Sequence, residues 1–121
     1  MNWNHFLLVG LGGFIGSLAR YSVSLLIRPS GFPFATLLVN LAGSFLIGII
    51  IAVSIRNPQL KPEWRLFLAT GFCGGFTTFS AFAIENLELL RNGQYGYSIA
   101  YVAGSIVLGI FAAYLGFSLA R

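Results

Sequence analysis

The sequence has very little charge, and this scarcity excludes most kinds of soluble protein. Only 8% of its 121 residues are charged, whereas 57% are hydrophobic, and the mean hydropathy is +0.85. A soluble domain of this size needs far more charged surface, so the lipid bilayer is its expected solvent. The formal net charge of +4 fits anchoring beside a membrane, and no basic cluster suggests a nucleic-acid partner.

Cysteine and acidic residues are also scarce, which removes several chemistries. The single Cys73 cannot form an internal disulfide and has no partners for a metal site. No Asp or Glu falls in three of the four apolar stretches described below, which argues against proton-coupled export of cations. We expect Glu85 and Glu88 to face water or to pair with Arg91. No nucleophile–base pair or phosphate loop is present, so the sequence does not predict an enzyme.

Four apolar stretches each approach the ~20 residues that span a hydrocarbon core of about 30 Å. They cover residues 4–27, 34–55, 65–90 and 97–120. The first is longer than a signal peptide and follows no Lys or Arg, so we expect it to be retained as a helix. The stretches together predict an all-α, multi-pass membrane protein with a single four-helix transmembrane domain over residues 1–121.

The basic residues hint at how the protein inserts. One side of the membrane would hold Arg56, Lys61, Arg65 and Arg121, and the other would hold Arg28, Arg91 and, if it snorkels that way, Arg20. Such a weak bias permits insertion in both orientations and therefore an antiparallel dimer, although a small protein with one orientation fits the charges equally well. Small residues at a spacing of four, such as Gly12 with Gly16 and Ser44 with Gly48, predict close helix contacts. Because four helices enclose almost no interior, a pore would lie near a subunit interface.

Residues 71–82, with the sequence GFCGGFTTFSAF, interrupt the third apolar stretch. Three glycines followed by a Thr-Thr-Phe-Ser cluster predict that the helix breaks in mid-membrane, between Gly74 and Thr77. Broken backbone is tolerated at that depth only where its freed N–H and C=O groups face protein, water or an ion. The sequence therefore predicts an ion site at this break.

The polar residues within the stretches are mostly neutral hydrogen-bond donors, a set that suits an anion. They include Thr36 and Asn40 in the second stretch, Thr70, Thr77, Thr78 and Ser80 in the third, and Tyr101 and Ser105 in the fourth. A hydrogen bond between helices is an equally good interpretation of Asn40 alone. Phe79 and Phe82 share a helix face, where their positive ring edges could stabilise an anion, although ordinary packing is the more common role. Arg20 could attract anions in an aqueous vestibule or simply snorkel to the interface.

These motifs resemble those of the Fluc (CrcB) family of fluoride channels over essentially the whole chain. The strongest match is residues 71–82, which is similar to the family pattern G-x-x-G-G-x-[ST]-T-F-S-T-F; residues 12–21 and 36–40 match less specific elements. Ala35, Ala81 and Gly109 depart from the family pattern, and some members carry a third hydroxyl at the position of Gly109.

The resemblance implies passive, fluoride-specific export across the bacterial inner membrane, lowering toxic fluoride in the cytoplasm. It implies an antiparallel, dual-topology homodimer with two pores and a structural, non-transported sodium ion held by the carbonyls of Gly74 and Thr77. The pore residues that it implies are Asn40, Phe79, Phe82, Thr78, Ser80, Tyr101, Ser105 and Thr36, with Arg20 in a vestibule.

Two alternative functions remain from the sequence. A small four-helix multidrug exporter has a similar length, but the acidic residue expected in its first span is missing here. A structural membrane subunit without transport activity would leave the broken third span unexplained.

Overall fold

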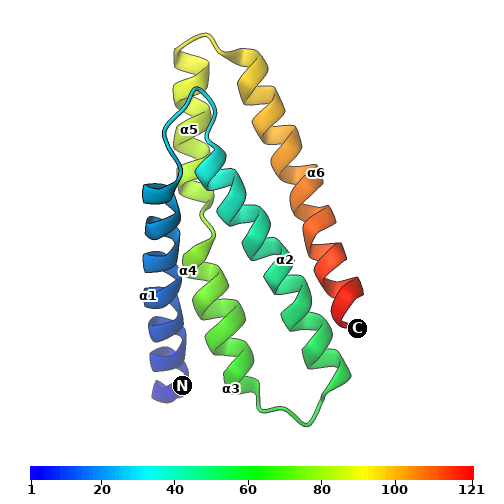
Figure 1. Ribbon diagram of the computed structural model, residues 1–121. Coiled ribbons are helices and arrows are strands. Elements are labelled where there is room, and N and C mark those ends of the chain that lie inside the picture. Colours follow the sequence, from blue (N-terminus) through cyan, green and yellow to red (C-terminus); the bar gives the residue numbers. More distant parts are fainter.

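The computed structural model describes residues 1–121, and helices make up most of the chain (Figure 1). Their bounds are α1 (Trp3–Leu26), α2 (Phe34–Arg56), α3 (Pro62–Arg65), η1 (Leu66–Cys73), α4 (Gly74–Phe76), α5 (Phe79–Arg91) and α6 (Tyr95–Ala120). Four helical units are long and apolar enough to cross a membrane, and α3 through α5 together form the third. The all-helical membrane class predicted from hydropathy is therefore confirmed.

The chain reverses direction where the sequence carries capping and turn residues. The Asn2 side chain caps α1 by accepting the N–H of Asn4 at 2.9 Å. Pro62 stands in the first turn of α3, where its missing N–H costs no helical hydrogen bond. Gly93, with φ of 73°, is the only residue with positive φ and forms the sharp turn between α5 and α6.

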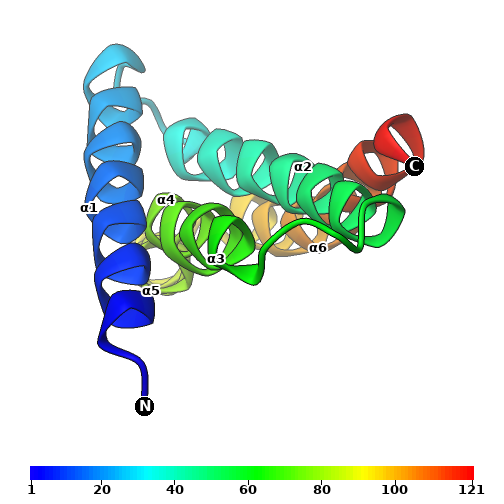
Figure 2. The same ribbon diagram turned by 90° about the horizontal axis from the view of Figure 1, so that it is seen from below.

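The helices pack mainly as two pairs. α1 lies along η1 and α4, while α2 lies along α6, and the view in Figure 2 separates the two pairs. α2 and α6 run in the same direction from one end of the molecule (Figure 1). Each pair meets at glycines, because a Cβ at Gly16 would overlap the Phe72 carbonyl oxygen and one at Gly48 would overlap that of Ala113.

The third unit is irregular over much of its length. η1 is a π-helix, a form that is rare and often found at functional sites. Thr77 and Thr78 then adopt extended backbone, with φ and ψ of −87° and 156° and of −149° and 119°. The predicted break is therefore present but begins later than expected: Gly74 and Gly75 are helical, and the interruption falls on the two threonines. Gly75 instead permits close contact with the Gly13 carbonyl of α1.

Little of the chain is shielded by its own fold. Only 14 of the 121 residues are buried, and large apolar side chains on every long helix are exposed. Contiguous apolar surface of this kind needs lipid or another protein to cover it. The bilayer therefore supplies much of the environment that a soluble protein would find in its own core.

Candidate anion pathway at the helix break

Asn40 of α2 bonds to the broken backbone. Its Oδ1 accepts the N–H of Thr78 at 2.8 Å, and its Nδ2 donates to the Thr78 carbonyl oxygen at 3.2 Å. These two bonds require the amide oxygen and nitrogen in this one orientation. A carboxamide nitrogen carries two N–H donors, so one remains for another acceptor. Asn40 thus combines the helix-linking role that the sequence allowed with a spare donor at the break.

Other groups satisfy the backbone on either side of Asn40. The Thr77 N–H and hydroxyl both donate to the Cys73 carbonyl at 2.9 Å. Nε of Arg20 donates to the Gly75 carbonyl at 3.2 Å. Arg20 is half-buried and bonded to the break through Nε, and both its vestibule role and its snorkelling to the interface stay predictions. The Thr78 hydroxyl accepts the N–H of Ala81 at 3.1 Å and thereby caps α5.

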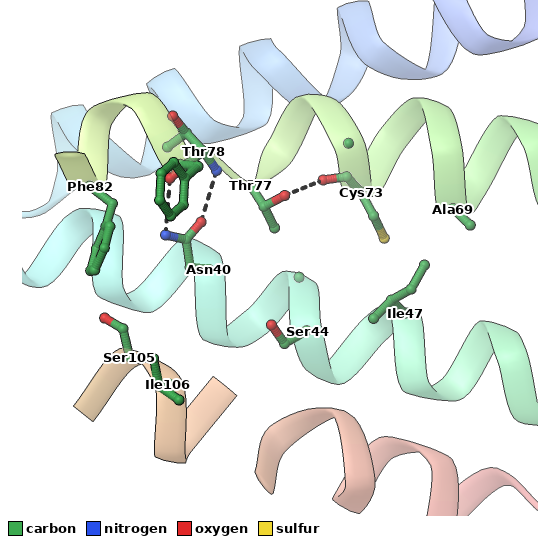
Figure 3. Close-up of a pocket in the computed structure, with 13 residues that line it drawn as sticks. Asn40, Ser44, Ile47, Ala69, Cys73, Thr77, Thr78, Phe82, Ser105 and Ile106 are labelled. Carbon is green, nitrogen blue, oxygen red and sulfur yellow. Dashed lines mark hydrogen bonds between the residues drawn. The ribbon is translucent and has the colours of Figure 1, made fainter. Parts of the chain in front are cut away.

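A cavity of about 500 Å³ opens beside the break (Figure 3). It lies between α2, α6 and the third unit, and it is open on one side. Its lining is Asn40, Gly43, Ser44, Ile47, Ala69, Cys73, Gly74, Thr77, Thr78, Phe79, Phe82, Ser105 and Ile106. Seven of the predicted site residues are therefore brought together: Asn40, Thr78, Phe79, Phe82, Ser105, Gly74 and Thr77. None of the lining residues is charged, so any ion in the cavity meets only neutral groups.

The two predicted aromatic residues border the cavity in different surroundings. The ring centroids of Phe79 and Phe82 lie 5.5 Å apart with the planes tilted by 43°. Phe79 is 80% exposed, whereas Phe82 is half-buried and lies 4.8 Å from the Tyr101 ring. Phe82 therefore joins the cavity to the fully buried Tyr101, whereas Phe79 is a lining residue that the rest of the chain leaves exposed.

Ser105 carries the clearest unused hydrogen-bonding group in the cavity. Its hydroxyl oxygen is buried and has no hydrogen-bond partner in the protein. A buried hydroxyl without a partner is unfavourable by about 1–3 kcal/mol. The Ser105 hydroxyl and the spare N–H of Asn40 are thus donors at the cavity that have no acceptor in the protein.

Thr36 and Tyr101 lie one helical turn beyond the cavity, where both bind the carboxylate of Glu85. Their hydroxyls donate to the two oxygens of Glu85, at 2.7 Å from Thr36 and at 2.8 Å from Tyr101. Glu85 does not pair with Arg91, as one of the two expectations had it; it is half-buried and bonds these two hydroxyls. The predicted row of donors without carboxylates is also wrong at this level, because the two hydroxyls already have an acidic acceptor.

Four of the predicted site residues do not line the cavity. Thr36 and Tyr101 lie at the Glu85 cluster, and Arg20 lies behind the break at Gly75. Ser80 is exposed and has its hydroxyl 3.3 Å from that of Thr78. Ser44 was missed as a lining residue because its spacing to Gly48 indicated helix packing. Its position four residues after Asn40 was the signal that could have identified it.

The two predicted sodium ligands occupy suitable positions. The Thr78 N–H, which would reach the Gly74 carbonyl in a continuous helix, donates to Asn40 instead. The carbonyl of Thr77 accepts no hydrogen bond, and both residues border the cavity. No cluster of three His, Cys, Asp or Glu side chains could hold a metal elsewhere. The donor set is thus carbonyl oxygen, which suits a hard cation.

Comparison with known proteins decides the family. The sequence profile described as CrcB-like protein, Camphor Resistance (CrcB), matches residues 7–117. The chain belongs to this family. A Chlorobium chlorochromatii relative is 54% identical, with 97% of this chain and 92% of the relative aligned. A Thermus thermophilus relative is 50% identical, with 94% and 93% aligned. Both relatives carry the name fluoride-specific ion channel FluC, so the predicted family is confirmed, and it is a family of channels and not of enzymes.

Proposed function

We propose that this chain is a fluoride-specific ion channel through which fluoride leaves the cell down its electrochemical gradient. The observation that carries the proposal is the uncharged cavity at the helix break, with two unpaired donors on Asn40 and Ser105. The names of the CrcB-like relatives support fluoride as the ion. The channel would act in the inner membrane of a bacterial cell and lower cytoplasmic fluoride.

Fluoride is a demanding substrate because it holds its water tightly. Moving an uncompensated ion into a low-dielectric medium is unfavourable by tens of kcal/mol, so hydrogen-bond donors must replace the lost water along the whole path. The Asn40 amide, the Ser105 hydroxyl and the positive edges of Phe79 and Phe82 can do this without a fixed positive charge. A lining without cations also lets the ion leave, as conduction requires.

The direct test is ion efflux from liposomes that contain the purified protein. Fluoride should leave on addition of a potassium ionophore, without a proton gradient, and chloride should be retained. Efflux that needs a proton gradient would instead favour the exporter, and no efflux of either anion would favour a structural subunit. Protein-free liposomes provide the baseline.

We further propose that two copies form an antiparallel dimer that encloses two such pathways. The open side of the cavity and the exposed apolar surface both call for a covering partner. A cysteine placed at Asn92, in a Cys73→Ala background, should react with an impermeant reagent from both sides of the membrane. Labelling from one side only would contradict dual insertion.

The sodium ion is part of the same proposal. Gly74 and Thr77 of each subunit would direct four carbonyl oxygens to the dimer axis, and a bound sodium would satisfy them. The site would have a structural role, without transport. Replacing sodium by N-methylglucamine during purification should therefore reduce dimer yield and fluoride efflux, and restored sodium should recover both. Radioactive sodium should not enter the liposomes.

A further inference from the structure

Polar residues on α2 and α6 face one another in successive levels. The two helices run in parallel, and each carries its polar residues at intervals of four (Figure 1). The levels pair Thr36 with Tyr101, Asn40 with Ser105, and Ser44 with Gly109. At the third level only α2 carries a polar side chain, because α6 has a glycine there.

Ser44 occupies the space beside the missing side chain. A Cβ at Gly109 would lie 3.8 Å from the Ser44 hydroxyl oxygen, which is ordinary contact, and no other atom outside the adjoining part of α6 is within 4 Å. Ser44 also lines the cavity, and its side chain lies in the gap between α2 and α6 (Figure 3). The next level is closed, since Gly48 meets the Ala113 carbonyl there. Ser44 therefore stands at the last open level of this groove.

The Ser44 hydroxyl is not used within its own helix. Serines on lipid-exposed or helix-end positions commonly return their hydroxyls to nearby carbonyls, as Ser22 does to Leu18 at 2.8 Å and Ser54 to Ile51 at 2.9 Å. Ser44 makes no such bond. Its hydroxyl can therefore donate to a molecule in the cavity.

We infer that Ser44 donates a hydrogen bond to the permeating anion at the end of the groove and replaces the hydroxyl that Gly109 cannot supply. The inference rests on the proposed fluoride channel and adds a residue to its lining. The polar path changes helices at this level, from Ser105 on α6 to Ser44 on α2. An anion leaving Ser105 and Asn40 would thus meet a further donor before it reaches the backbone at Gly74 and Thr77.

The test compares four variants by fluoride efflux per folded molecule. Ser44→Ala should lower the rate about threefold to tenfold, which is the effect of one neutral hydrogen bond. Gly109→Ser in the Ser44→Ala background should recover most of the lost rate, because the new hydroxyl would occupy the same space. Gly109→Ala in that background fills the space without a donor and should not recover it. Ser54→Ala, on the same helix but bonded to its own backbone, should match the wild type.

The outcomes separate this inference from the channel itself. If the wild type conducts fluoride and Ser44→Ala conducts equally well, Ser44 is not a ligand, although the channel proposal stands. Recovery by Gly109→Ala as much as by Gly109→Ser would show that packing, and not a donor, was lost. If the wild type conducts no fluoride, the channel proposal fails, and the inference fails with it.

Discussion

The third membrane-spanning unit has two halves, residues 62–76 before the break and α5 after it. Different kinds of contact hold the two halves in place. The first half approaches α1 backbone to backbone, with Gly71 and Gly75 against the carbonyls of Val9 and Gly13. The second half is held by side-chain hydrogen bonds, among them those of Glu85. Backbone contact holds the first half rigidly against α1 but offers few polar groups to an ion. Side-chain contact in the second half supplies polar groups that an ion can use. The cavity lies where the two meet.

The largest effect on stability is expected from disturbing the first half. In Gly75→Val the added side chain would overlap the Gly13 backbone, which neither helix can easily move. Overpacking of this kind typically lowers the free energy of unfolding by about 1–3 kcal/mol, and a backbone obstacle places it at the upper end. The yield of monodisperse protein after detergent extraction measures the effect. Gly10→Ala provides the control, since a Cβ at Gly10 meets nothing within 4 Å. An equal loss of monodisperse protein in Gly10→Ala would contradict the proposed backbone contact between α1 and the first half.

The largest effect on transport is expected from the junction of the two halves. Asn40→Asp removes both N–H donors and places a carboxylate beside the path. Repulsion between two unit charges 4 Å apart is about 4 kcal/mol at an effective dielectric of 20, so fluoride efflux should fall by at least about a hundredfold.

Phe82→Ile should likewise reduce fluoride efflux strongly, about tenfold or more, because it removes a ring edge from the lining. Phe111→Ile is the matched control on an exposed face of α6. Wild-type flux in both Phe82→Ile and Asn40→Asp would refute the proposed lining.

A smaller effect on stability is expected in the second half, where the side-chain hydrogen bonds of Glu85 can be weakened. Glu85→Gln leaves one oxygen to serve the two hydroxyls of Thr36 and Tyr101, so the free energy of unfolding should fall by about 1 kcal/mol. Glu88→Gln on the exposed side of the same helix should leave the unfolding temperature unchanged. Tryptophan fluorescence during heating measures both. Equal unfolding temperatures for the two variants would indicate that the Glu85 hydrogen bonds contribute nothing to stability.

The sequence predicted those features of the fold and the site that depend on residues close together in the chain. Hydropathy located the four spans, and the cluster after Gly75 located the break to within a few residues. The interval between Thr36 and Asn40 identified a polar face of α2. Such features depend on residues that are close in the chain, so periodicity and turn chemistry reveal them.

Features that depend on helix-to-helix geometry were missed. The Glu85 cluster joins residues 49 and 16 positions apart, and no local pattern places Glu85 between them. The π-helix was missed because its residues, 66–73, have an ordinary apolar composition. Ser44 was assigned to packing because it also satisfies a small-residue spacing; the structure adds that it lines the cavity and faces the open space beside Gly109.

The bonding of Asn40 has a consequence for how a transmembrane segment can be interrupted. One amide that accepts the N–H and donates to the C=O of the same residue reproduces the reciprocal pairing of two peptide groups in an antiparallel ladder. The interruption at Thr78 is thus closed by a single rung of β-sheet, which α2 supplies from a side chain. A carboxamide suits that rung because its donor and its acceptor are on separate atoms, whereas leucine has neither group and an ionised aspartate lacks the donor. The lipid-embedded chain therefore tolerates extended backbone here without a neighbouring strand.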